Sequence, residues 1–79
     1  MQVQLSYFAV LRDQRGLSSE TVTTEAPTYR ALYESLAAEH GFTLPPSLVS
    51  VAVNGVFGAM DDSVQEGDQI VFIPPVAGG

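Results

Sequence analysis

Hydrophobic and polar residues alternate at the start of the chain. In "QVQLSYFAVL", apolar or aromatic side chains occupy every second position from residue 3 to residue 11. A strand turns successive side chains to opposite faces, so this spacing predicts a strand over residues 2–11 with one buried face. Phe8 and Val10 break the polar face of that strand. The polar stretch "RDQRGLSSE" contains Gly16 and predicts a hairpin connection. "TVTTE" then predicts a second strand.

The period of the pattern changes over residues 28–40. One apolar stripe follows the spacing i, i+3, i+4, i+7 and i+8, and its members are Tyr29, Leu32, Tyr33, Leu36 and Ala37. That spacing predicts a helix. Thr28 is the expected N-cap, and Gly41 supplies the left-handed end. His40 lies in the last turn, where we expect a solvent-exposed cap residue. The prolines of "FTLPPS" predict a loop after the helix.

Three more strands are expected after this loop. "LVSVAV" is a nearly continuous apolar run, and the dipeptide "NG" after it is the strongest two-residue hairpin signal. "VFGAM" is then a short partner strand, and "IVFI" is the last strand, ended by Pro74 and Pro75. Between these two strands lies an acidic turn that we expect to be a solvated loop and not a calcium site. Its acidic residues are Asp61, Asp62, Glu66 and Asp68.

This order of elements predicts an α+β roll in which one helix covers one face of a mixed sheet. The first and last strands are both apolar, so we expect them to pair in parallel in the middle of the sheet. The predicted core consists of Leu5, Tyr7, Leu32, Leu36, Val51, Val53, Ile70 and Phe72. Residues 1–73 form the predicted domain, and residues 74–79 an extended, flexible tail.

The composition limits the classes of function. The chain has 79 residues, a net charge of -6, no cysteine and only three basic residues, all arginines. The lack of cysteine excludes disulfides and thiolate chemistry. Nucleic acid is a poor partner for such an acidic surface. The acidity either attracts a basic protein or only keeps the domain dispersed. We see no membrane segment or signal sequence and expect a cytoplasmic protein.

The last six residues, "PPVAGG", are the remaining candidate for chemistry. The single histidine and the serines lack a second activating group. Two prolines favour an extended polyproline conformation, and two glycines have no side chain to obstruct a narrow channel. The segment is either an ordinary frayed end or the carrier of a reactive terminal carboxylate. A carboxylate is a poor electrophile, so a partner would have to activate it.

Three stretches resemble a known family. "YFAVLRDQRG", "VAVNG" and "GDQIVFIPPVAGG" are similar to MoaD-type sulfur carriers, the small subunits of molybdopterin synthase. These carriers are ubiquitin-like β-grasp proteins of the MoaD/ThiS superfamily. The resemblance implies that an ATP-dependent, MoeB-type adenylating enzyme activates Gly79, which then becomes a thiocarboxylate. The tail, with Gly78 and Gly79, would enter a MoaE-type large subunit and deliver sulfur to cyclic pyranopterin monophosphate.

The same resemblance implies where the catalytic groups and contacts lie. The catalytic side chains would belong to the large subunit, so this chain would be no enzyme on its own. It would bind no cofactor or metal, and ATP would be used by the activating enzyme. The expected partner contacts are Phe8, Arg12, Phe57, Ile73, Pro74, Pro75, Val76 and Ala77. The alternative is that the apolar members of this set only cover a thin core.

Two other functions remain open. Sulfur carriers of thiamin, cysteine or ubiquitin-related modifier pathways also end in Gly-Gly on a β-grasp, although the double proline favours the molybdopterin branch. The chain could also be a β-grasp interaction module whose tail is inert.

Overall fold

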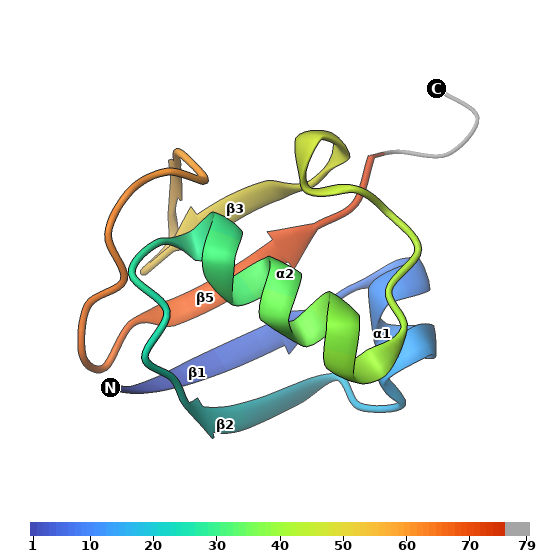
Figure 1. The fold of residues 1–79 in the computed structure, drawn as a ribbon, viewed down its shortest axis with the longest axis horizontal. Helices are drawn as coiled ribbons and strands as arrows, with labels where there is room; N and C mark the ends of the chain where they lie inside the picture. Colours follow the sequence, from blue (N-terminus) through green and yellow to red (C-terminus); the bar gives the residue numbers. More distant parts are fainter. Residues whose placement is uncertain (76–79) are drawn as a thin grey trace.

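A five-stranded mixed sheet carries the fold, and one long helix lies across one of its faces (Figure 1). The computed structural model describes residues 1–75. The strands are arranged in the order β2-β1-β5-β3-β4. Their bounds are Gln2–Tyr7 for β1, Ser19–Thr23 for β2, Ser50–Val53 for β3, Val56–Gly58 for β4 and Gln69–Ile73 for β5. The predicted α+β architecture is confirmed.

The two ends of the described chain meet inside the sheet. Strands β1 and β5 pair in parallel, with Leu5 opposite Ile70 and Tyr7 opposite Phe72. β5 is flanked by β1 and β3 and is the central strand. The predicted parallel pairing is therefore correct. It places the end of β5, and the chain that follows, at the same end of the sheet as the end of β1.

Helix α2 spans Tyr29–His40 and matches the predicted helix. The Thr28 hydroxyl accepts a hydrogen bond from the Ala31 backbone N–H at 3.1 Å, as an N-cap residue does. Gly41 ends the helix at φ 77°, where a residue without Cβ is favoured. The buried residues of α2 form one core cluster with side chains of β1, β5 and β3. Seven of the eight predicted core side chains are buried, and Val53 is half-buried.

The prediction for residues 8–15 is wrong. β1 ends at Tyr7, and a short helix, α1, spans Ala9–Arg15 where a continued strand and hairpin connection were expected. Leu11 is completely buried. Its spacing of four from Tyr7 suits one helical face as well as strand alternation, so the pattern was ambiguous. Ala9, at φ 49°, turns the chain out of the sheet, and Gly16 caps α1 at φ 82°.

Smaller differences concern element bounds. β2 begins two residues before the expected "TVTTE", and β4 is shorter than "VFGAM". The loop before β3 contains a single 3-10 turn, η1, over Pro46–Leu48. The hairpin turn is as predicted, with positive φ at both Asn54 and Gly55. Within residues 1–75, no helix is long and apolar enough to cross a membrane.

Candidate functional site

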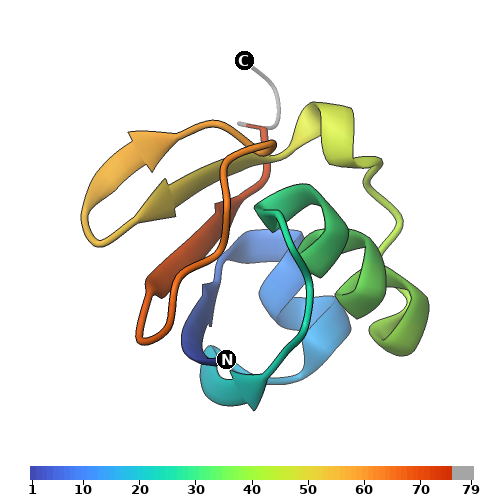
Figure 2. The same cartoon turned by 60° about the vertical axis from the view of Figure 1, so that its left-hand side comes forward.

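One face of the sheet is free of helices (Figure 2). Ile70 and Phe72 are buried beneath α2, so strand alternation turns Val71 and Ile73 to the opposite, open face. In the register of the sheet, Val71 lies opposite Ala52, and Ala52 lies opposite Phe57. An apolar row therefore crosses β4, β3 and β5, and Ile73 continues it toward the end of β5.

Phe57 is the most exposed member of this row. Its relative exposure is 74%. Phe57 and Ile73 were predicted partner contacts, and the structure places both on the open face. Val71 and Ala52 were not predicted. The alternation of "IVFI" could have identified Val71, whereas Ala52 joins the row only through the pairing of β3 with two neighbours. We define the apolar patch as Ala52, Phe57, Val71 and Ile73.

Phe8 lies at the edge of the apolar patch, although the sequence predicted it inside a continued strand. It is the N-cap residue of α1 and not part of a strand, and it is 52% exposed. Since Tyr7 pairs with Phe72, Phe8 and Ile73 each follow one member of that pair, at the same end of the sheet.

Arg12 lies one helical turn beyond Phe8. The Arg12 backbone N–H donates to the Phe8 carbonyl at 3.4 Å. The Arg12 guanidinium is 3.7 Å from the Asp13 carboxylate, and both side chains are exposed. Such an exposed pair stabilises little. The cationic head is therefore available to a partner at this end of the sheet.

The tail begins where the apolar patch ends. β5 stops at Ile73, Pro74 is buried, and Pro75 is exposed. Proline cannot donate to a ladder, so strand pairing ends here. The predicted tail residues Val76, Ala77, Gly78 and Gly79 lie outside the described residues.

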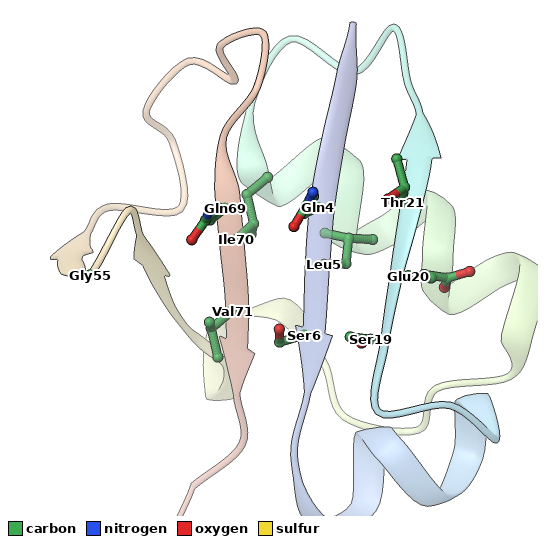
Figure 3. Close-up of a pocket in the computed structure, with 10 residues that line it drawn as sticks. All are labelled: Gln4, Leu5, Ser6, Ser19, Glu20, Thr21, Gly55, Gln69, Ile70 and Val71. Atoms are coloured by element: carbon green, nitrogen blue, oxygen red, sulfur yellow. The ribbon is translucent and has the colours of Figure 1, made fainter.

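The other half of the open face is polar but uncharged. A shallow hollow there is bordered by side chains of β2, β1 and β5 (Figure 3), among them Gln4, Ser6, Ser19, Thr21 and Gln69. Glu20 belongs to β2 but alternates to the α2 side, opposite buried Leu5. Over residues 1–75, the strand side chains that face the open side include no charged group. Depletion of charge is typical of the centre of protein interfaces.

A buried carboxylate fixes the hairpin that carries Phe57. Asp68 is 4% exposed, although we expected it in a solvated loop. It accepts hydrogen bonds from the Tyr29 hydroxyl at 2.6 Å, the Gln65 N–H at 2.8 Å and the Asn54 amide at 3.2 Å. Burial by itself raises the pKa of Asp68, but these hydrogen bonds together outweigh burial and hold the pKa below its usual range.

Asn54 also joins the β3–β4 hairpin to β5 through two hydrogen bonds with Gln69. Its backbone N–H donates to the Gln69 carbonyl at 2.8 Å, and its side-chain oxygen accepts from the Gln69 N–H at 2.9 Å. The β3–β4 turn is thereby tied to the start of β5 and, through Asp68 and Tyr29, to α2. The position of Phe57 relative to the end of the sheet is consequently set by this network of hydrogen bonds, in which the Tyr29–Asp68 contact is buried.

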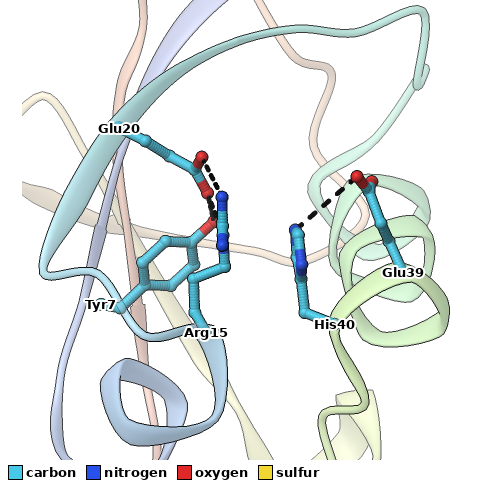
Figure 4. Close-up of polar contacts among 5 residues, drawn as sticks. All are labelled: Tyr7, Arg15, Glu20, Glu39 and His40. Carbon is cyan, nitrogen blue, oxygen red and sulfur yellow. Dashed lines mark hydrogen bonds and ion pairs between the residues drawn. The ribbon is translucent and has the colours of Figure 1, made fainter.

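A second polar cluster lies on the α2 side of the sheet (Figure 4). Arg15 donates two hydrogen bonds to the Glu20 carboxylate, at 2.7 and 2.8 Å, and the Tyr7 hydroxyl donates a third at 2.8 Å. The hydrogen bonds from Arg15 are the main reason that the pKa of Glu20 is lowered. The cluster joins α1 to β1 and β2. His40 is half-buried, which corrects the expectation that it is solvent-exposed.

The described residues combine an exposed apolar patch with two polar clusters inside the domain. Residues 1–75 contain no cluster of histidine, aspartate or glutamate arranged to hold a metal ion. The polar clusters around Asp68 and Glu20 are internally satisfied. What the structure offers is an apolar patch on an uncharged face, beside the start of the C-terminal segment.

Strand order, the parallel β1–β5 pair and the helix across one face define a ubiquitin-like β-grasp protein. The model of the ThiS family matches residues 5–79. The chain is also 30% identical over 80 residues to the molybdopterin synthase sulfur carrier subunit of Escherichia coli K12, with 98% of this chain and 99% of the relative covered. The chain therefore belongs to the ThiS family.

Two solved structures agree with this fold. SAMP1 from Haloferax volcanii aligns over 100% of both chains with a TM-score of 0.78 and 22% identity. A chain of the complex of subunits 1 and 2 of the molybdopterin-converting factor from Helicobacter pylori aligns over 100% of both chains, with a TM-score of 0.66 and 20% identity. At these identities the likeness concerns the fold alone.

Proposed function

We propose that this protein is a sulfur carrier whose C-terminal Gly79 becomes a thiocarboxylate and supplies sulfur for molybdopterin. The observation that carries the proposal is that the ThiS family match continues to residue 79 and so includes the terminal Gly-Gly. The Escherichia coli relative, matched over nearly its whole length, is named a molybdopterin synthase sulfur carrier subunit. The open apolar patch at the root of the tail supports a carrier that docks on other proteins.

The chemistry of the proposal divides between the chain and its partners. The Gly79 carboxylate attacks ATP on the activating enzyme, which releases pyrophosphate and leaves an acyl adenylate. A sulfur donor at the oxidation level of hydrosulfide then attacks the acyl carbon, its S–H proton is lost and AMP leaves, so the product is a thiocarboxylate. The thiocarboxylate sulfur then attacks cyclic pyranopterin monophosphate, and water cleaves the bond between the acyl carbon and sulfur, so that sulfur stays on the pterin and the Gly79 carboxylate is regenerated. This chain contributes the terminal carboxyl group and the surface that positions it.

We infer that the large synthase subunit docks on the apolar patch, with Phe8 and Arg12 at its edge. The fold relative from Helicobacter pylori was solved as a complex of subunits 1 and 2. Pro74 and Pro75 would direct the chain away from the sheet, and Val76 and Ala77 would lie in the partner. Gly78 and Gly79 would pass where a Cβ has no room.

The test of this function uses the purified chain, the cognate activating enzyme, a sulfur donor and ATP. We expect pyrophosphate release and an intact mass that corresponds to replacement of one carboxylate oxygen by sulfur. The matched control lacks Gly79. Its carbonyl would end about 3.5 Å short of the reaction centre, so we expect a folded chain without thiocarboxylate. Normal sulfur loading of this deletion variant would rule the proposal out.

The competing pathways are separated by the acceptor. Loaded chain mixed with a molybdopterin synthase large subunit and cyclic pyranopterin monophosphate should yield molybdopterin. A loaded chain that discharges only to thiamin or cysteine biosynthetic enzymes would assign it to another pathway.

A further inference from the structure

The two edges of the sheet differ in how many backbone groups they leave open. Just before β2, the Ser18 carbonyl accepts from the Tyr7 N–H, and just after it, Thr24 exchanges hydrogen bonds with Met1 at 2.8 Å. Antiparallel pairs alternate, so the register places Glu20 and Val22 in hydrogen-bonded pairs with β1. The N–H and C=O groups of Ser19, Thr21 and Thr23 therefore point away from the sheet.

The edge at β4 is smaller. β4 has three residues, and Val53 and Val56 flank a two-residue turn, so they form a hydrogen-bonded pair. Val56 and Gly58 consequently point their backbone groups toward β3, and Phe57 is the one residue of β4 whose N–H and C=O point outward. Strand β2 is thus the longer open edge of the described sheet.

Three devices that commonly protect a sheet edge, namely proline, lysine and a bulge, are absent from β2. It contains no proline or lysine, and its register with β1 runs without a bulge from Ser19 to Thr23. In Figure 1, β2 forms the lower border of the ribbon, and no helix or strand is drawn beyond it. Its three outward residues are exposed and carry only hydroxyl side chains. The one acidic residue of the strand, Glu20, is bound by Arg15 on the α2 side.

We propose that the β2 edge binds an extended, basic segment of a partner protein as a sixth strand. The backbone groups of Ser19, Thr21 and Thr23 would supply the ladder hydrogen bonds. On the α2 side, Val22 is half-buried against the core, and a β-branched residue of the added strand would cover it. Glu25 lies two residues beyond β2 and is exposed, so a lysine or arginine of the segment meets an acidic group there.

Charge favours a basic partner over a second copy of this chain. Two copies would each carry a net charge of -6 and would repel one another, whereas a basic strand would be attracted. The site is also independent of the proposed sulfur chemistry. β2 and β4 are opposite edges of the sheet, so a strand on β2 leaves the apolar patch free.

The test uses the full chain labelled with nitrogen-15 and a synthetic peptide, Lys-Thr-Val-Thr-Val-Thr-Lys, observed by NMR. We expect shifts of the Ser19, Thr21 and Thr23 amides, and exchange with solvent at least about tenfold slower at saturation. The same peptide with N-methyl groups at alternate residues keeps its side chains but cannot form the ladder, and it should not bind. The assay involves neither ATP nor Gly79, so its failure and failure of the sulfur-carrier assay are distinguishable.

A pair of variants tests the edge itself. Thr21→Pro removes an outward N–H that makes no bond to β1, so it should spare the fold and weaken peptide binding at least about tenfold. Thr21→Val keeps that N–H and should bind within about twofold of the wild type. If Thr21→Pro does not fold, the N-methylated peptide still tests whether the ladder hydrogen bonds are needed, because that experiment uses the wild-type chain.

Several results would overturn this proposal. They are equal binding by Thr21→Pro, equal binding of the N-methylated peptide, shifts confined to the apolar patch, or no binding up to about 1 mM peptide. Protection of the same three amides by self-association in the absence of peptide would assign the edge to a second copy instead.

Discussion

At the scale of single residues, Asp68 combines burial with three hydrogen-bond donors. A buried carboxylate without such donors would be costly, and donors without their acceptor would be costly as well. The residue therefore specifies one arrangement of three segments: the β3–β4 turn, the turn before β5 and the start of α2.

Replacement of Asp68 tests this arrangement. Asp68→Asn turns an amide N–H₂ toward groups that already donate, so at least one donor loses its acceptor. We expect a loss of about 2–4 kcal/mol in the free energy of unfolding, measured by urea denaturation. Asp13→Asn is the matched control, because Asp13 is exposed and its pair with Arg12 is long. A loss below about 0.5 kcal/mol for Asp68→Asn would show that the network is dispensable.

Acid should destabilise the fold through the same carboxylates. Asp68 and Glu20 both have a pKa that is lower in the folded chain than the ordinary values of 3.8 and 4.5. Each therefore contributes stability that is complete above its ordinary pKa and is lost as the pH falls through the lowered value. We expect the urea midpoint to be flat from pH 7 to about 5 and to fall below about pH 4. Asp68→Asn should show a smaller fall, and an unchanged acid profile in this variant would contradict the assignment to Asp68.

At the scale of elements, α2 contributes four buried side chains to the core, more than any other element. Its buried residues recur along one stripe, and its ends coincide with a side-chain cap at Thr28 and a left-handed glycine at Gly41. Helix α1 depends on packing to a greater extent. It has seven residues, no side-chain cap and one buried anchor, Leu11. A helix that short is not stable alone, so the sheet must hold it in place.

Leu36→Ala tests the register of α2. Leu36 is buried in the core, and the change should lower the free energy of unfolding by about 2–5 kcal/mol. Ser35→Ala, one residue away on the exposed side of the helix, should alter it by less than about 0.5 kcal/mol. Similar effects of the two substitutions in urea or thermal unfolding would mean that the helix faces the sheet differently.

At the scale of the whole molecule, the sheet separates two surfaces. The helices lie on one face (Figure 2), and the uncharged open face carries the apolar patch, which reaches the end of β5 at Ile73. The parallel pairing of β1 and β5 is responsible, because it brings Phe8 and Ile73 to one end of the sheet.

Phe57→Ala and Phe8→Ala test the docking role of this end of the molecule. Both side chains are exposed, so thermal unfolding should change little. Binding to the large synthase subunit should weaken by at least about 1 kcal/mol for each, measured by calorimetry. Leu48→Ala is the matched control, because Leu48 is 53% exposed but lies in η1 and outside the apolar patch. Equal affinity for all three variants would exclude the apolar patch from the interface.

Local patterns in the sequence determined much of this protein. The helix over 28–40, its two caps and the Asn-Gly turn follow from residue types and spacing within a few positions, and the structure confirms them. The pairing of the first and last strands was also predictable, because only a central position buries two apolar strands. The terminal Gly-Gly was visible as a candidate site from the sequence alone, and it stays a prediction.

Only the tertiary structure decided the features that depend on contacts distant in sequence. Residues 7 and 11 fit a strand and a helix equally well, and in the structure the paired part of β1 ends at Tyr7 while Leu11 is buried from helix α1. Asp68 lies in an acidic turn that the sequence predicts to be solvated. In the structure it is buried and accepts hydrogen bonds from residues 39 and 14 positions away. The apolar patch likewise requires the register of three strands, since Ala52, Val71 and Phe57 become neighbours only through backbone pairing across the sheet.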